Sequence, residues 1–132
     1  MPKAREALII YIVDDDDSVR TGLSRLMRSA GFEARAFGSA DRFLEEVREE
    51  GTACILLDMT MPRVTGIEVQ RRLKERGIHL PVIAVSARDD EDTRRAARDL
   101  GAQFFFRKPV DDQALVDAIV WATGSSEKTR SA

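Results

Sequence analysis

The stretch Leu8-Ile9-Ile10-Tyr11-Ile12-Val13-Asp14-Asp15-Asp16-Asp17 runs from uninterrupted apolar residues straight into a run of aspartates. An apolar run of this length, without polar alternation, predicts a short strand that is buried on both faces. Further runs of this kind occupy residues 53–57, 82–85 and 104–106, and a weaker strand is expected at 33–37. Strands buried on both faces belong in a sheet that helices cover on each side.

Longer segments with helical spacing separate the apolar runs. In the first of them Val19, Leu23 and Leu26 fall at i, i+4 and i+7, on one face of a helix. The other predicted helices contain Phe43 and Val47, Val69 and Leu73, Ala96 and Ala97, and Leu115 and Ile119. This alternation predicts an α/β protein with a flavodoxin-like doubly wound (βα)5 fold, whose five-stranded parallel sheet has the order 2-1-3-4-5.

The ends of the predicted helices carry recognisable residues. Ser39 is the predicted N-cap of the second helix, because its hydroxyl can accept a hydrogen bond from a backbone N–H of the first turn. Gly51, Gly77 and Gly101 stand where helices are expected to end before the next strand, since glycine tolerates the left-handed backbone that often follows a helix.

Composition narrows the class of protein. The 132 residues fit one domain, expected at 8–122, between a disordered N-terminus at 1–7 and a disordered tail or linker start at 123–132. A net charge of −2 gives no basic footprint for nucleic acid.

The first apolar run is too short for a membrane span or a signal-peptide core, so we expect a cytoplasmic protein. Cys54, inside an apolar run, is expected to be a buried and unreactive thiol.

Polar residues stand at the ends of four predicted strands. The first strand ends at Asp14 and Asp15, the third at Asp58, the fourth at Ser86 and the fifth at Lys108. The carboxyl ends of parallel strands meet at one edge of the sheet, where such folds bind their ligands. We therefore expect carboxylates, a hydroxyl and an ammonium group to converge there.

This set of groups favours phosphoryl chemistry assisted by a metal ion. Carboxylates at close quarters repel one another unless a cation joins them, and hard oxygen ligands suit Mg²⁺. A carboxylate beside such a cation can attack a phosphoryl group and form an acyl phosphate. Lys108 could offset the charge of the phosphoryl oxygens, and Ser86 could donate a hydrogen bond to them.

Each of these residues also has a structural interpretation. Asp16 and Asp17 could simply be acids at a helix N-terminus, where the helix dipole favours negative charge. Asp58 alone could be a turn or cap residue, Ser86 could cap the next helix, and Lys108 could be an ordinary surface residue. Their coincidence at one edge of the sheet favours the functional interpretation.

The residues resemble the receiver domain of bacterial response regulators over about 8–122. The motifs that carry the resemblance are Ile12-Val13-Asp14-Asp15, Leu56-Leu57-Asp58-Met59-Thr60-Met61-Pro62 followed by Gly66, Val85-Ser86-Ala87, and Arg107-Lys108-Pro109. Each motif alone is weakly specific, whereas all four in this order and at receiver-like spacing are strongly specific.

The resemblance implies a role for each matching residue. Asp58 would be the phosphoacceptor, and Mg²⁺ or Mn²⁺ would be held by Asp14, Asp15, Asp58 and the backbone carbonyl of Thr60. Lys108 and Ser86 would contact the phosphoryl group. Ser86 and Phe105 would switch together on phosphorylation, and the Lys108–Pro109 peptide bond would be cis. The side chains of Thr60 and Arg88, which flank the site, are expected to tune the lifetime of the phosphoryl group.

The resemblance also implies how the domain works with other proteins. A histidine kinase or a histidine phosphotransfer protein would donate the phosphoryl group, and the domain would catalyse its own phosphorylation and dephosphorylation without being a turnover enzyme. The surface of the fourth helix, fifth strand and fifth helix would change to control an output, with transcription as one option. A homodimer through this surface is a further option, while direct binding to nucleic acid or membrane is not expected.

Two other classes of protein were weighed. A receiver-like interaction module that needs no phosphorylation is the main alternative, although such modules generally lose some of the residues that are intact here. A phosphohydrolase of the haloacid-dehalogenase type also uses an aspartate nucleophile. It needs a second aspartate two residues later, where this chain has Thr60.

Overall fold

The computed structural model describes residues 8–49, 51–88 and 90–131, and within them strand and helix alternate five times. The strands are β1 (Ile9–Val13), β2 (Glu33–Phe37), β3 (Ala53–Asp58), β4 (Val82–Ser86) and β5 (Ala102–Arg107). The helices are α1 (Asp17–Ser29), α2 (Ala40–Glu46), α3 (Gly66–Glu75), α4 (Glu91–Asp99) and α5 (Asp112–Ser131). The expected disordered segment at 1–7 lies outside the described residues.

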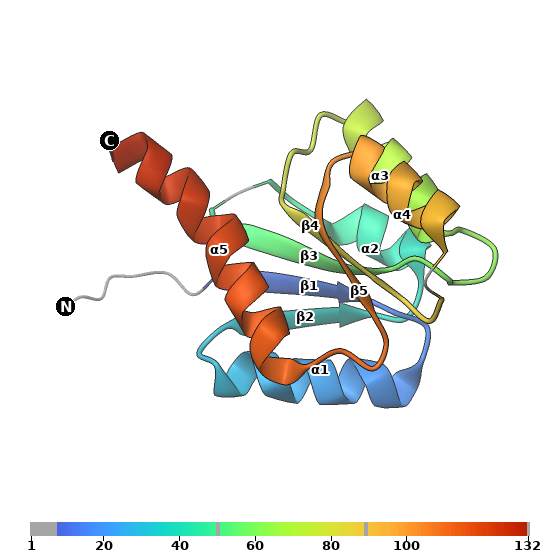
Figure 1. The fold of residues 1–132 in the computed structure, drawn as a ribbon, viewed down its shortest axis with the longest axis horizontal. Helices are drawn as coiled ribbons and strands as arrows, with labels where there is room; N and C mark the ends of the chain where they lie inside the picture. Colours follow the sequence, from blue (N-terminus) through green and yellow to red (C-terminus); the bar gives the residue numbers. More distant parts are fainter. Residues whose placement is uncertain (1–7, 50, 89, 132) are drawn as a thin grey trace.

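The five strands form one parallel sheet in the order β2-β1-β3-β4-β5, which confirms the predicted fold class (Figure 1). The register aligns the carboxyl ends of neighbouring strands. Val13 pairs with both Phe37 and Leu57. One residue further on, Asp58 pairs with Val85. The residues that follow these strands therefore emerge at the same edge of the sheet.

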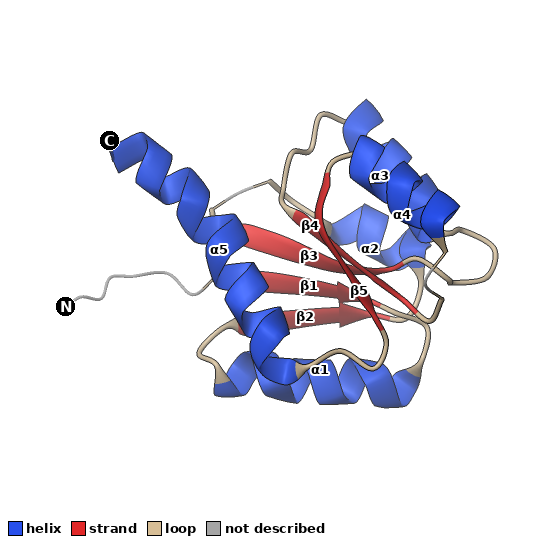
Figure 2. Cartoon of the chain, viewed as in Figure 1, coloured by secondary structure: helices blue, strands red, loops and turns tan. Residues whose placement is uncertain are grey.

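Helices cover both faces of the sheet, with α1 and α5 on one face and α2, α3 and α4 on the other (Figure 2). Successive residues of a strand point to opposite faces. Tyr11 and Val13 accordingly pack in the cluster that faces α2 and α3, whereas Ile10 and Ile12 pack against α1 and α5. This confirms the expected burial of the central strands on both faces.

The helix ends agree with the sequence at most positions. Ser39 is the N-cap of α2, as predicted, and its hydroxyl accepts a hydrogen bond from the amide of Arg42 at 3.1 Å. Gly77 and Gly101 follow α3 and α4 with φ of 73° and 107°. The expected helix end at Gly51 is wrong, because α2 already ends at Glu46. At Val47 the backbone becomes extended, and the side chain of this residue is buried in the core.

Helix α5 is longer than the sequence analysis expected. It continues to Ser131, and so includes the described part of the segment 123–132, for which we expected a disordered tail or the start of a linker. Glutamate, lysine and arginine in this segment are good helix formers, and extending an existing helix costs far less than starting one. In Figure 1 the helix extends past the amino ends of the strands. Among the described residues, no helix is both long enough and apolar enough to cross a membrane.

Candidate functional site

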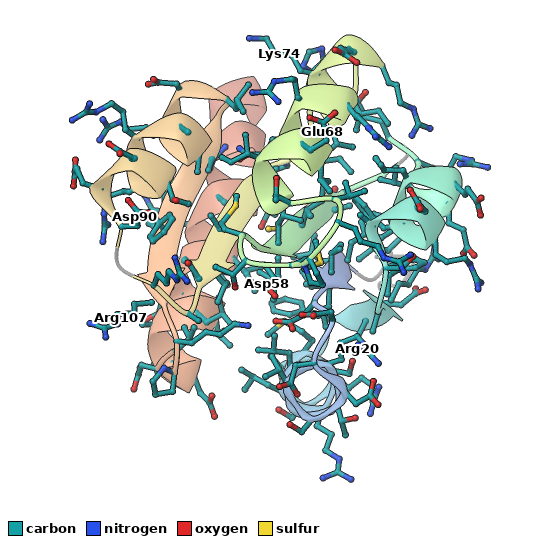
Figure 3. The ribbon with its side chains drawn as sticks, turned by 90° about the vertical axis from the view of Figure 1, so that its right-hand side faces the viewer. Arg20, Asp58, Glu68, Lys74, Asp90 and Arg107 are labelled. Atoms are coloured by element: carbon teal, nitrogen blue, oxygen red, sulfur yellow. The ribbon has the colours of Figure 1, made fainter. Side chains whose placement is uncertain are left out.

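Four strands deliver polar side chains to the carboxyl edge of the sheet. Asp58 is the last residue of β3 and Ser86 the last of β4, while Asp14 and Lys108 directly follow β1 and β5. Asp14 and Asp58 are each only 3% exposed, and Ser86 is fully buried. Figure 3 shows Asp58 in the middle of this edge, below the N-terminal end of α3. The convergence expected from the strand ends is therefore present in the fold.

Three carboxylates form a compact acidic group at this edge. Asp14, Asp15 and Asp58 each offer an oxygen, and these oxygens all lie within 4.8 Å of one another. Within the described part of the chain, this is the group of three or more potential metal ligands that the fold assembles. Two members are buried and Asp15 is exposed. Oxygen ligands from two strands, open to solvent on one side, fit a hard divalent cation such as Mg²⁺.

Lys108 brings a positive charge to the two buried carboxylates. Its ammonium nitrogen lies 2.9 Å from Asp14 Oδ2 and 3.5 Å from Asp58 Oδ2. Burial by itself would lower the pKa of Lys108, but the hydrogen bond to Asp14 and the charge of Asp58 outweigh it, so the pKa is raised overall. The lysine therefore stays protonated well above neutral pH and faces the buried carboxylate of Asp58.

The two oxygens of Asp58 have different surroundings. Oδ1 accepts hydrogen bonds from the backbone N–H of Thr60 at 3.0 Å and from its hydroxyl at 2.9 Å. Oδ2 faces Lys108. From the sequence we expected the carbonyl of Thr60 to be a metal ligand and its side chain to tune the lifetime of a phosphoryl group. The contact of its hydroxyl with Asp58 was missed. An aspartate that accepts from the backbone N–H two positions later is a common turn pattern, so the spacing could have suggested the backbone contact of Thr60 but not its hydroxyl contact.

Ser86 and Phe105 occupy neighbouring strands behind the acidic group. The Ser86 hydroxyl accepts a hydrogen bond from the amide of Arg88 at 3.1 Å, and its carbonyl accepts one from the amide of Lys108 at 2.8 Å. Phe105 is half-buried, and the guanidinium carbon of Arg94 on α4 lies 4.7 Å from the centre of its ring. The Lys108–Pro109 peptide bond is cis, the geometry expected from the sequence.

Asp16 and Asp17 belong to the start of α1. Asp16 is the N-cap, and its Oδ1 accepts from the amides of Ser18 at 2.9 Å and Val19 at 3.1 Å. The hydrogen bond from the Ser18 hydroxyl is the main cause that lowers the pKa of Asp16. Asp17 forms an ion pair with Arg20. The structural interpretation of these two acids is thus confirmed.

Arg20 is a residue near the site that the sequence analysis missed. Its guanidinium donates a hydrogen bond to the backbone carbonyl of Asp14 at 2.7 Å. The i, i+3 spacing of Asp17 and Arg20 is visible in the sequence. The contact with Asp14, however, depends on the turn after β2, where Gly38 leaves room for the guanidinium.

The family described as response regulator receiver domain matches residues 10–120 of the chain. The response regulator protein TodT of Pseudomonas putida is 40% identical over 95% of this chain and 55% of its own length. Nodulation protein W of Bradyrhizobium diazoefficiens is 38% identical over 98% of this chain and 57% of its own. The structure of full-length FixJ from B. japonicum superposes with a TM-score of 0.86 and 31% identity, over 96% of this chain and 63% of that one.

The fold, and the acidic residues at the carboxyl edge of its sheet, are those of two-component receiver domains. The chain belongs to the response regulator receiver domain family, as the resemblance of its motifs implied. It spans a little over half the length of the relatives TodT and nodulation protein W. As a receiver domain, the chain belongs to a class of protein that is not a turnover enzyme.

Proposed function

We propose that Asp58 accepts a phosphoryl group from a histidine kinase or a histidine phosphotransfer protein. The observation that carries the proposal is the pairing of a buried carboxylate with two other acids and with the ammonium of Lys108, 3.5 Å away. A cluster of two buried acids and one exposed acid at this spacing has no evident value for stability alone. It does suit a site that must bind a cation and a phosphoryl group.

In the proposed transfer, a carboxylate oxygen of Asp58 forms a bond to the phosphorus of the partner's phosphohistidine. The P–N bond breaks, and its electron pair returns to the imidazole nitrogen. Lys108 is positioned to pair with the phosphoryl oxygens as charge shifts onto them. Because Thr60 holds Oδ1 of Asp58, the orientation of the carboxylate is fixed before the partner arrives.

The acidic group would hold Mg²⁺ or Mn²⁺ through Asp14, Asp15, Asp58 and the carbonyl of Thr60. The bound cation would supply positive charge to the phosphoryl oxygens. Of the acids, Asp15 is the exposed one and offers its oxygen from the solvent side, whereas Asp14 is shared with Lys108. Water that enters on the same side would hydrolyse the acyl phosphate, and the side chains of Thr60 and Arg88 are proposed to control its access.

Phosphorylation would then change the surface formed by α4, β5 and α5. The Ser86 hydroxyl would leave the amide of Arg88 to contact the phosphoryl group, and Phe105 would move inward. On its outer side Phe105 borders a cavity of about 180 Å³ between α4 and β5, which Arg94 and Ala97 also line. Such a switch shifts the population between two packings, biased by a local charge.

The output of the proposed switch would be control of a further segment or partner. Relatives such as FixJ of Azorhizobium caulinodans are named transcriptional regulatory proteins and are longer than this chain. We propose that this domain also controls transcription, and that it does so in the cytoplasm. Its α4–β5–α5 surface would be available for a homodimer. The alternative is an interaction module that needs no phosphorylation, and the complete set of Asp14, Asp15, Asp58, Ser86 and Lys108 disfavours it.

The deciding experiment is the intact mass of the protein after incubation with acetyl phosphate and Mg²⁺. Wild type should gain the mass of one phosphoryl group, and Asp58→Asn should gain none. Asp41→Asn, which removes an exposed aspartate on α2, serves as the matched control and should behave like wild type. If neither acetyl phosphate nor a panel of histidine kinases labels wild type, the interaction module becomes the better hypothesis.

A further inference from the structure

Arg20 ties together the two ends of the loop that carries the metal-binding acids. Its Nη1 donates to the carbonyl of Asp14 at 2.7 Å, where β1 ends. Its Nη2 pairs with the carboxylate of Asp17, where α1 begins. The Arg20 side chain is only 21% exposed, so it is largely packed into the protein. In Figure 3, Arg20 and Asp58 are seen at the same edge of the sheet.

The same guanidinium also lies against the turn that follows β2. A Cβ atom placed on Gly38 would be 2.9 Å from Nη1 and 3.1 Å from Cζ of Arg20, which is closer than such atoms normally approach. This turn already meets the acidic loop, because the amide of Asp14 donates to the carbonyl of Phe37 at 3.1 Å. Gly38 therefore provides the space that Arg20 needs to reach the Asp14 carbonyl.

The carbonyl that Arg20 holds belongs to the same planar peptide unit as the amide of Asp15. Fixing this plane fixes the direction in which the backbone enters Asp15, whose exposed side chain has no comparable packing of its own. The carboxylate of Asp14 is held separately, by the amide of Asp16 at 2.9 Å and by Lys108. Arg20 thus holds the backbone between Asp14 and Asp15, while other groups hold the carboxylate of Asp14.

We propose that Arg20 is a positioning residue for the cation site: it holds the Asp14–Asp15 peptide so that both carboxylates face Asp58. This inference rests on the proposed function, since it concerns the affinity of the same acidic group for a divalent cation. Residues that orient a metal ligand from outside typically change metal affinity by about 10- to 100-fold. We expect about the lower end of that range, because Asp14 keeps its other partners.

Charge and positioning predict opposite results for the loss of Arg20. Removing a positive charge beside three carboxylates makes the site more negative, so charge alone predicts tighter binding of a divalent cation. Losing the fixed peptide plane predicts weaker binding. The direction of the change therefore separates the proposed role from a general electrostatic effect.

The experiment measures the dissociation constant of Mn²⁺ by the electron paramagnetic resonance signal of the free ion. It compares wild type, Arg20→Met, Gly38→Ala and the double variant. Arg25→Met, which removes an exposed arginine from the same helix, is the matched control for charge. We expect Arg20→Met to raise the dissociation constant about tenfold, and Arg25→Met to leave it unchanged or slightly lower.

Gly38→Ala keeps the charge of Arg20 and displaces its flexible end, so it should also weaken Mn²⁺ binding. Added to Arg20→Met it should have no further effect, because both changes remove the same contact. Equal or tighter binding by Arg20→Met, or an unchanged constant in Gly38→Ala, would overturn the proposal. If wild type itself binds no Mn²⁺, the proposed cation site fails and this inference falls with it.

Discussion

The two carboxylate oxygens of Asp58 are held in different ways. One of its oxygens is held by two donors of Thr60, while the other faces an ammonium that also binds Asp14. The raised pKa of Lys108 means that its ion pairs stabilise the fold below its ordinary pKa of 10.5. This contribution is lost only as the pH rises through the raised value, so the site keeps its charge pattern over the physiological range.

Cys54 is the residue whose chemistry the fold suppresses most clearly. It lies fully buried in β3, against the side of the sheet that α1 and α5 cover. Loss of hydration raises its pKa from 9.0 to about 12. We predict that a thiol reagent such as 5,5′-dithiobis(2-nitrobenzoic acid) leaves the native protein unlabelled at pH 8 and labels it fully in guanidinium chloride. Rapid labelling without denaturant would contradict this burial.

The same shift in the pKa of Cys54 predicts a pH dependence of stability. Between pH 9 and pH 12 the unfolded chain loses the thiol proton while the native protein keeps it. The free energy of unfolding should therefore fall as the pH rises through this window, by up to about 1.4 kcal/mol per pH unit from this group. Denaturant titrations of Cys54→Val at several pH values should show a shallower fall than those of wild type.

At the level of the elements, α3 begins in contact with the end of β3. A Cβ atom on Gly66, the first residue of α3, would lie 2.8 Å from the carbonyl oxygen of Asp58 and 2.8 Å from Cα of Met59. These are backbone atoms, which cannot move aside without shifting the strand end. The glycine in the receiver motif thus allows α3 to pack directly over the end of β3 at Asp58.

We predict that Gly66→Ala lowers the free energy of unfolding by about 1–3 kcal/mol, as overpacking typically does. Gly22→Ala is the matched control: Gly22 lies in α1, and no atom would come within 4 Å of its new Cβ. The control should raise stability by about 0.5–1 kcal/mol, because alanine favours a helix over glycine. Urea titrations of both variants test the prediction, and equal stability would refute the close contact.

At the scale of the whole molecule, the fold brings together a cluster of like charges, and a bound cation should reduce their mutual repulsion. Asp14, Asp15 and Asp58 come from two strands, so they are brought together only when the chain folds. A cation that binds this cluster binds the native state and not the unfolded chain. At a Mg²⁺ concentration about ten times the dissociation constant, the gain in stability should be about 1.4 kcal/mol.

This gain predicts that Mg²⁺ raises the melting temperature of wild type by several degrees and leaves that of Asp15→Asn almost unchanged. Differential scanning calorimetry at constant ionic strength separates cation binding from general screening of charge. NaCl added to match the ionic strength is the control for that screening. An equal shift in both proteins would show that the effect does not come from the acidic group.

The sequence by itself determined the order of the elements and the strand ends at which the polar residues stand. Periodicity reports which faces are buried, and in a parallel sheet burial on both faces requires helical crossovers. The edge at which Asp14, Asp58, Ser86 and Lys108 meet follows from this topology alone. Local signals such as the N-cap at Ser39 also act within a few residues, so the sequence displays them directly.

The tertiary structure alone decided which groups touch within the site. The contact of Arg20 with the Asp14 carbonyl depends on the turn after β2, where Gly38 leaves room for the guanidinium. The end of α2 at Glu46 depends on the core that receives Val47. Such features join residues far apart along the chain. Their energies come from packing in three dimensions, which no local pattern of residues encodes.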